Sequence, residues 1–217
     1  MSKTAILLGA SGLVGSELLK LLLENTEYDK VKIFVRTSLS VQHPKLEEII
    51  FDVDSVSNLE SQITGDVLFC CLGTTIKVAG SQEAFRKVDY SLPLLFANIA
   101  KKNGVEKFLL VSSLGADKSS SNFYLRVKGE VEAALGSIGF KTLIIVRPSM
   151  LLGKRKQFRF GELIGKAVMK SLSFVFIGKL RKYKAIEATK VAKAMSILSI
   201  QESQGFQIFE SDYLQHF

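Results

Sequence analysis

The chain has 217 residues, of which 47% are hydrophobic and 23% are charged, and its formal net charge at pH 7 is +8. This length fits one domain with a sizeable core, and no stretch approaches the roughly 20 uninterrupted apolar residues of a membrane-spanning helix. The two cysteines, Cys70 and Cys71, are adjacent and there are only two histidines, so we expect no disulfide framework, no metal site and a reducing, cytoplasmic location.

Short apolar runs alternate with helical patterns over residues 1–150, which predicts βαβ units and a parallel sheet. The expected strands are 4–8, 31–35, 48–52, 67–71, 108–112 and 142–146. The expected helices are one that begins near residue 12 and those at 57–63, 81–88, 93–102 and 123–135. Right-handed crossovers between these strands predict a Rossmann-type α/β fold, a doubly wound parallel sheet with helices on both faces.

The regular alternation ends after Pro148. The later patterns are 160–170 and 188–198 for helices and 207–209 for a strand. We therefore expect a single dinucleotide-binding domain over residues 1–217. Its core is residues 1–150, and residues 151–217 form a short extension on the substrate side.

The positive charge is concentrated in the last third of the chain. Residues 1–150 contain 17 Lys and Arg against 16 Asp and Glu, whereas residues 151–217 contain 12 against 5. A basic segment such as 154–159 can bind a nucleic acid, an anionic membrane or an acidic substrate. Because no nucleic-acid-binding motif accompanies it, we expect a solvated surface near an anionic cofactor and no specific nucleic-acid partner.

A glycine-rich turn follows the first strand. Segment 9–15 reads GASGLVG and stands between a buried strand and the start of a helix. In Rossmann domains such glycines let the backbone approach a pyrophosphate, and the helix N-terminus favours its negative charge. The strand–turn–helix context favours dinucleotide binding over a purely structural turn. The residues expected to contact the cofactor here are Gly9, Ser11, Gly12, Leu13, Val14 and Gly15.

The end of the second strand indicates which dinucleotide fits. An acidic residue there accepts a hydrogen bond from the ribose of NAD, whereas an arginine pairs with the 2′-phosphate of NADP. Arg36 follows this strand, and no acidic residue stands at that position. We therefore expect NADPH or NADP to be the cofactor, with NAD less suited. Asp52, which closes the third strand, is a candidate for the adenine amino group, and a solvated turn residue is nearly as good an interpretation.

Two further strand ends are expected to border the cofactor, because ligands of open parallel sheets lie at the carboxyl ends of the strands. Cys71, Leu72 and Gly73 follow the fourth strand, where Gly73 lets the backbone pass close to a ribose. The cysteines are expected to be small core residues rather than reactive thiols. Arg147 and Pro148 follow the sixth strand, where backbone can contact the carboxamide; the Arg147 side chain can instead pair with a carboxylate.

Acid–base chemistry is indicated by Tyr124 and Lys128, which stand four residues apart on one expected helix. A lysine ammonium favours the phenolate form of a nearby tyrosine. Tyr124 can then donate a proton to a carbonyl oxygen while hydride arrives from the nicotinamide. A serine after the fifth strand can stabilise the oxyanion. Ser112 and Ser113 are both candidates. Because neighbours on a strand point to opposite sides, we expect only one of them to face the site, and we prefer Ser113.

Three longer strings carry a family resemblance: CCLGTT at 70–75, SSLGADKSS at 112–120 and YLRVKGEVE at 124–132. Together with the glycine turn, they resemble the short-chain dehydrogenase/reductase superfamily in its extended or atypical branch. Within it, they are most similar to the Tat-interactive oxidoreductases and their bacterial NAD(P)-binding relatives. The resemblance covers most of the chain. It implies NADPH binding, Tyr124 as proton donor and acceptor, Lys128 beside it, and a cytoplasmic location.

Two departures limit what this resemblance transfers. Cys71, Leu72 and Gly73 replace the Asn-Ala-Gly that often follows the fourth strand of such reductases. The region after the sixth strand is also short, at about 70 residues. A short region implies a shallow or small substrate site, or a site completed by another subunit.

Three functions compete for these residues. The first is an oxidoreductase that transfers hydride from NADPH to a small carbonyl substrate, for which the basic segment weakly favours a negative charge. The second is an NADP(H)-sensing regulator with little turnover. The third is a sugar-nucleotide epimerase or dehydratase, against which the short C-terminal region argues. We favour the enzyme because a sensor needs only the glycine turn and Arg36, not Ser113, Tyr124 and Lys128. A monomer and a homodimer both remain open.

Overall fold

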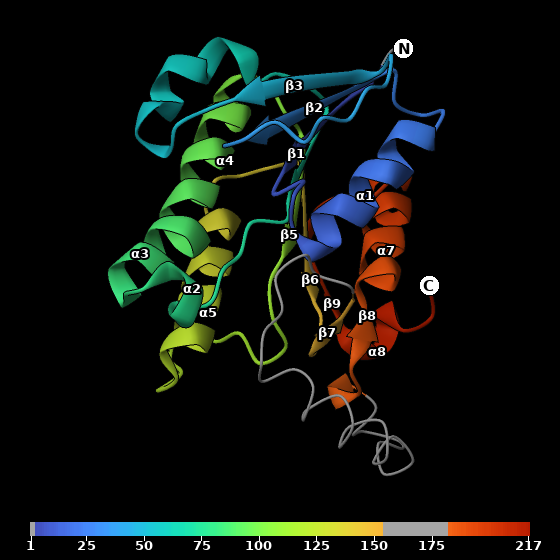
Figure 1. Cartoon of the computed structure of the whole chain (residues 1–217). Helices are drawn as coiled ribbons and strands as arrows, with labels where there is room; N and C mark the ends of the chain where they lie inside the picture. The colour runs from blue at the N-terminus through green and yellow to red at the C-terminus, as the bar shows by residue number, and fades with distance from the viewer. Residues whose placement is uncertain (1–2, 154–181) are drawn as a thin grey trace.

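The computed structural model describes residues 3–153 and 182–217. Seven parallel strands form one sheet in the order β3-β2-β1-β4-β5-β6-β9, with helices on both faces (Figure 1). Its strands are β1 (Thr4–Leu8), β2 (Lys30–Val35), β3 (Leu46–Ile50), β4 (Val67–Cys70), β5 (Lys107–Val111), β6 (Thr142–Arg147) and β9 (Gly205–Glu210). The doubly wound Rossmann-type fold predicted from the sequence is confirmed.

The helices within the described residues differ in type and length. The α-helices are α1 (Leu13–Glu24), α2 (Ile76–Ala79), α3 (Gln82–Arg86), α4 (Leu92–Lys102), α5 (Phe123–Gly136), α7 (Ala188–Ile200) and α8 (Ser211–Leu214). The other elements are a 3₁₀ helix η1 (Val53–Gln62), a π-helical turn η2 (Lys87–Ser91) and a small parallel pair, β7 (Leu151–Leu152) with β8 (Ile186–Glu187).

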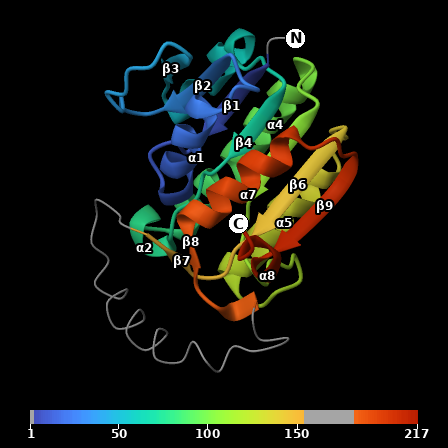
Figure 2. The same cartoon turned by 90° about the vertical axis from the view of Figure 1, so that its right-hand side faces the viewer.

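The central strands are continuous apolar runs because both faces of the sheet are covered. In β1, four consecutive residues, Ala5, Ile6, Leu7 and Leu8, are at most 1% exposed. Successive side chains of a strand point to opposite faces. Ala5 and Leu7 therefore enter the core beneath α1 and α7, while Ile6 and Leu8 enter the core on the side of α4 and α5. Figure 2 shows α7 running across the face beside α1.

The sheet has its topological switch point at β1. This strand pairs with β2 on one side and with β4 on the other, so the order of the chain through the sheet reverses here. In open parallel sheets, ligands bind outside the carboxyl ends of the strands at such a point. The glycine turn follows β1 and lies at this place.

The C-terminal elements extend the sheet. β9 pairs with β6 along its whole length, and α7 packs along α1. The helix predicted at 188–198 and the strand predicted at 207–209 are confirmed, each with longer bounds. The helix predicted at 160–170 and the basic segment 154–159 lie outside the described residues.

The third strand is shifted from its predicted position. β3 begins at Leu46 and ends at Ile50 rather than covering 48–52, because its ladder with β2 starts where Leu46 pairs with Val31. The prediction that Asp52 closes this strand was wrong, since Asp52 lies two residues beyond its end.

The helix predicted at 81–88 is interrupted. The Ser81 side chain caps α3 by accepting a hydrogen bond from Ala84 N–H at 3.0 Å. The chain then passes through the π-helical turn η2 before α4 begins. A π turn inserts an extra residue that a 3.6-residue periodicity does not reveal. The helix predicted at 57–63 is the 3₁₀ helix η1, which begins earlier.

Candidate functional site

The glycine turn after β1 is packed tightly against the end of β4. Gly9 has φ +80°, and a Cβ there would lie 2.6 Å from the carbonyl carbon of Cys71. A Cβ at Gly15 would lie 2.1 Å from Gly9 O, and one at Gly12 would lie 3.1 Å from the same atom. Backbone packing alone therefore requires glycine at 9 and 15. Because packing already explains these glycines, their spacing is not evidence for a bound ligand. Evidence for a ligand comes instead from the N–H groups at the start of α1.

The N-terminus of α1 lies at this turn without a side-chain cap. Gly12 is the N-cap residue and offers no side-chain hydrogen bond, and the first turn of α1 contains no acidic residue. The first N–H groups of a helix lack intrahelical acceptors and carry partial positive charge. An anionic group such as a pyrophosphate fits these groups and balances their charge. The residues present therefore fit the dinucleotide that the sequence predicted.

The other residues of the turn divide between surface and core. Ser11 is exposed and Leu13 is half-buried, whereas Val14 is buried in the core beneath α1. What these residues share at this turn is the backbone N–H group, the kind of donor that a pyrophosphate accepts from at a helix start.

Arg36 and Asp52 lie at the same edge of the sheet, on the β2–β3 side. Arg36 directly follows β2 and its side chain is exposed. Asp52 is also exposed. Arg36 thus follows β2, the strand that pairs with β1, and β1 precedes the glycine turn.

Helix α5 has a row of polar side chains on the side that faces the protein interior. Tyr124, Lys128 and Glu132 follow one another at four-residue intervals and so share one side of the helix. Lys128 and Glu132 are each 4% exposed, and Tyr124 is half-buried. Gly129 lets the loop after β5 pack on this helix, because a Cβ there would lie 2.2 Å from the carbonyl carbon of Asp117.

Lys128 forms a buried ion pair. Its Nζ lies 2.7 Å from Oδ1 of Asp89, with side-chain exposures of 5% and 0%. Asp89 Oδ2 accepts a hydrogen bond from the Thr74 N–H at 2.9 Å. Burial disfavours the ammonium, but the Asp89 carboxylate and Tyr124 outweigh it and raise the pKa of Lys128 above its ordinary value. Lys128 is therefore a permanent cation at neutral pH, and Asp89 joins it to the loop after β4.

A second buried network occupies the β5–β6 side. The Ser112 hydroxyl donates a hydrogen bond to Glu132 Oε1. Glu132 also accepts from Arg147, whose Nε lies 3.1 Å from Oε1 and whose Nη2 lies 2.5 Å from Oε2. The Arg147 side chain thus takes the structural role, one of the two left open by the sequence. Among the described residues, the Ser113 hydroxyl donates only one long hydrogen bond, 3.4 Å, to the carbonyl of Leu114. The Ser113 hydroxyl is therefore held less strongly within the protein than the Ser112 hydroxyl, and it is the more available of the two to bond a ligand.

The two cysteines are buried or half-buried, and neither forms a disulfide. Burial raises the pKa of the Cys70 thiol to about 12 and raises that of Cys71 well above its ordinary value. Both thiols are therefore protonated at neutral pH, as expected for core residues rather than nucleophiles.

Contacts between strand ends gather most of the predicted residues. Gly9 meets the backbone of Cys71, and a Cβ on Gly73 would lie 3.8 Å from Lys128 Nζ. On the β6 side, the Leu114 N–H donates to the carbonyl of Pro148 at 2.9 Å. A chain of spatial contacts therefore connects four parts of the site: the glycine turn, the loop after β4, α5 and the end of β6. Arg36 and Asp52 stand apart from this group.

Two site residues were missed by the sequence reasoning. Glu132 continues the four-residue spacing of Tyr124 and Lys128, which was a usable signal. Asp89 is the only acidic residue in segment 84–105, and it stands just before an apolar helix. An isolated acid in such a segment needs a partner when it is buried.

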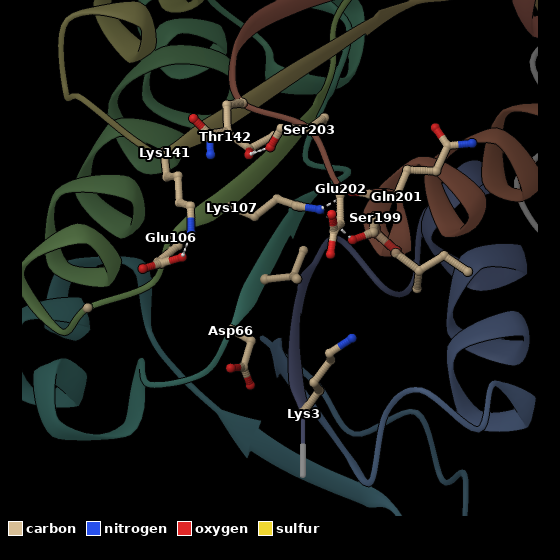
Figure 3. Close-up of a pocket in the computed structure, with 14 residues that line it drawn as sticks. Lys3, Asp66, Glu106, Lys107, Lys141, Thr142, Ser199, Gln201, Glu202 and Ser203 are labelled. Carbon is tan, nitrogen blue, oxygen red and sulfur yellow. Dashed lines mark hydrogen bonds and ion pairs between the residues drawn. The ribbon is translucent and has the colours of Figure 1, made fainter. Parts of the chain in front are cut away.

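A separate pocket of about 830 Å³ lies at the opposite, amino-terminal edge of the sheet (Figure 3). Lys107 Nζ donates to the carbonyls of Ser199 and Gln201, each at 2.8 Å, and so caps the end of α7. Lys141 pairs with Glu106 at 2.9 Å. The Lys107 bonds fasten α7 to the sheet, whereas the Lys141–Glu106 pair joins the residues that precede β6 and β5. The edge that carries the glycine turn is the better candidate for function.

Comparison with known proteins agrees with this geometry. A family described as NAD(P)H-binding matches residues 9–169, which is more than half of the chain. The chain belongs to this family. The match spans both the glycine turn and helix α5, the two parts of the site that the structure joins through the loop after β4. Membership of the NAD(P)H-binding family indicates a nicotinamide dinucleotide and leaves open the choice between NADP and NAD.

Relatives within the family confirm the resemblance seen in the sequence. HTATIP2 of Rattus norvegicus is 39% identical over 175 residues, which cover 79% of this chain and 72% of that protein. The mitochondrial protein FMP52 of Meyerozyma guilliermondii is 41% identical over 154 residues, covering 70% of this chain and 66% of that protein. The chain is an atypical short-chain dehydrogenase/reductase related to HTATIP2.

Solved structures confirm the fold. The enzyme WbmH of Bordetella bronchiseptica, in complex with NAD⁺, superimposes with a TM-score of 0.73 at 16% identity, covering 97% of this chain and 76% of that one. Within residues 3–153 and 182–217, no helix is long and apolar enough to cross a membrane. The cytoplasmic location expected from the sequence stays a prediction.

Proposed function

We propose that the protein is an NADPH-dependent oxidoreductase that reduces a small carbonyl substrate. The observation that carries this proposal is the buried, charged Lys128, one helical turn from Tyr124 and at the sheet edge that bears the glycine turn. A buried ion pair is weak support for stability, because desolvation offsets much of the attraction between the charges. A lysine kept charged beside a tyrosine is, in contrast, what an acid–base site needs.

The cofactor is proposed to lie across the switch point of the sheet. Its pyrophosphate meets the N-terminus of α1, and Arg36 pairs with a 2′-phosphate, which favours NADPH over NADH. Gly73 leaves room for the nicotinamide ribose, and the backbone at Arg147 and Pro148 faces the carboxamide. Asp52 is proposed for the adenine amino group. When bound, the nicotinamide supplies the hydride for carbonyl reduction.

Three side chains are proposed to handle the proton. Tyr124 donates its phenolic proton to the carbonyl oxygen as the alkoxide forms, and takes it back in the reverse reaction. The Lys128 ammonium stabilises the resulting phenolate. The Ser113 hydroxyl donates a hydrogen bond to the same substrate oxygen. Ser112 is not proposed for this role because its hydroxyl is bonded to Glu132.

The substrate side is proposed to come from the C-terminal part of a single domain spanning residues 1–217. β7 follows closely after β6 and pairs with β8, so these strands lie beyond the carboxyl end of the sheet. This is the edge at which Lys128 and the loop after β4 meet. A small carbonyl compound is proposed as the substrate.

Two measurements, titration calorimetry and then a turnover assay, test this function. We expect NADPH and NADP⁺ to bind more tightly than NADH at one ionic strength. We also expect NADPH oxidation with at least one member of a panel of small aldehydes and ketones, with and without a carboxylate. Binding of no dinucleotide would contradict the proposal. Tight NADPH binding without turnover would instead favour an NADP(H)-sensing regulator.

A further inference from the structure

The Asp89–Lys128 pair is tied to the surrounding fold at both carboxylate oxygens. Oδ1 lies 2.7 Å from Lys128 Nζ, and Oδ2 accepts the Thr74 N–H at 2.9 Å. Asp89 stands on η2, a π-helical turn, and such turns are frequent at functional sites. The exposed residue Gly73 covers the pair, since its Cβ position is 3.6 Å from Oδ1. The carboxylate is therefore fixed beneath the backbone expected to border the cofactor.

A second ion pair joins the same two parts of the chain on the outer side. Arg86 Nη1, at the end of α3, lies 2.6 Å from Glu130 Oε2 on α5, and the Arg86 guanidinium stacks over the Tyr90 ring at 4.8 Å. Arg86 and Glu130 have side-chain exposures of 39% and 29%, against 0% for Asp89. The segment formed by α3 and η2 is therefore joined to α5 by a partly exposed ion pair as well as by the buried Asp89–Lys128 pair.

Within residues 3–153 and 182–217, three titratable groups act on Lys128. Asp89 approaches from η2, Tyr124 from its own helix and Cys70 from β4. Burial keeps the Cys70 thiol protonated, since its pKa is about 12. Glu132, one turn further along α5, is already paired with Arg147. Asp89 is therefore the anion that balances the Lys128 ammonium.

We propose that Asp89 is a positioning residue that neutralises Lys128 and thereby holds Tyr124 in its protonated, proton-donating form. This inference rests on the proposed function. An ammonium paired with a carboxylate attracts a nearby phenolate less than a lone ammonium does. The balanced pair keeps the tyrosine proton in place to higher pH, so the proton-donating form that carbonyl reduction needs persists over a wider pH range. With Asp89 neutral, the phenolate would replace it as the counter-ion of Lys128.

Spectroscopic titration of the cofactor-free protein tests this without requiring turnover. Phenolate absorbance is followed against pH in the wild type and in Asp89→Asn, and the Tyr124→Phe version of each is subtracted to isolate Tyr124. We expect Tyr124 to half-ionise about one pH unit lower, or more, in Asp89→Asn. Glu130→Gln, which removes the outer ion pair of the same helices, is the matched control and should leave the titration in place.

Kinetics supply the second readout. The alkaline limb of the kcat/KM profile for reduction should move to lower pH in Asp89→Asn by the same amount. The acidic limb for alcohol oxidation, in which Tyr124 acts as the base, should move to lower pH with it. Asp89→Glu should keep the wild-type limb even if its rate is reduced. An unchanged or raised half-ionisation pH in Asp89→Asn would overturn the proposal.

The test also covers a variant that does not fold and a wild type that has no turnover. Asp89→Ser, which keeps an acceptor for the Thr74 N–H, replaces Asp89→Asn if the latter does not fold. If neither neutral variant folds while Asp89→Glu does, the carboxylate serves packing and the proposal fails. If wild type turns over no carbonyl, the proposed function fails, yet the absorbance titration still gives an answer on Asp89.

Discussion

The hydroxyl of Ser112 donates a hydrogen bond to the buried carboxylate of Glu132. Ser112 directly precedes Ser113, the serine proposed to contact substrate. The bond distinguishes the two adjacent serines by their hydrogen-bond partners. Ser112 belongs to a network with Glu132 and Arg147 that fastens α5 to the end of β6. In the part of the chain that the structure describes, the Ser113 hydroxyl has no comparable partner, since its one hydrogen bond there is 3.4 Å long.

Alanine at each serine should therefore give opposite results. Ser113→Ala is expected to lower kcat/KM by about 10²- to 10³-fold, the usual effect of losing one oxyanion donor, with an unchanged melting temperature. Ser112→Ala is expected to destabilise the fold by about 1–3 kcal/mol, because a buried carboxylate loses a donor. Denaturant unfolding and steady-state kinetics on both variants measure this. The reverse pattern would assign the oxyanion role to Ser112.

The predictable part of this fold is the part governed by local sequence. β1 was predicted with its observed bounds, because a strand buried on both faces is a continuous apolar run. The end of α4 was also predicted, at Lys102, where Asn103 and Gly104 stop the helix. The start of β3 was not, because it depends on its pairing with β2 rather than on its own residues.

The candidate site divides in the same way. The pairing of Tyr124 with Lys128 follows from helical spacing, so the sequence alone suggested it. The Asp89–Lys128 ion pair joins residues 39 positions apart through a π turn, and no periodicity reports either feature. The Arg147 side chain was left undecided because its partner, Glu132, is 15 residues away on another element. Long-range polar pairing is what the sequence could not supply.

Tyr124→Phe tests the acid–base role directly. The variant removes one hydroxyl and keeps the ring that packs 5.7 Å, centroid to centroid, from Phe85. We expect kcat to fall by about 10²- to 10⁴-fold, because a general acid is lost, while NADPH affinity changes little. Single-turnover kinetics with calorimetric binding measure both. Retention of wild-type turnover would exclude Tyr124 as the proton donor.

Arg36→Ala tests the choice of dinucleotide. Arg36 is exposed after β2, and the 2′-phosphate is the only group by which NADPH differs from NADH. Loss of a charge-assisted contact is expected to weaken NADPH binding by about 10- to 100-fold and to leave NADH binding nearly unchanged. Arg36→Lys should fall between, since lysine keeps the charge and loses the bidentate geometry. Equal losses for both dinucleotides would contradict the phosphate clamp.

The buried thiols predict how stability depends on pH. Burial raises the pKa of Cys70 to about 12, whereas an unfolded chain has a thiol pKa of about 8.5. Above that lower value the unfolded state loses the proton first, so the free energy of unfolding should fall as the pH rises from about 8.5 towards 12. Denaturant unfolding across this range measures the slope, and Cys70→Ala is expected to reduce it.

Thiol alkylation at neutral pH, followed by mass spectrometry, should leave both cysteines unmodified until the chain unfolds. Rapid labelling of Cys70 in the folded protein would show that its thiolate is accessible and would contradict its assignment as a core residue.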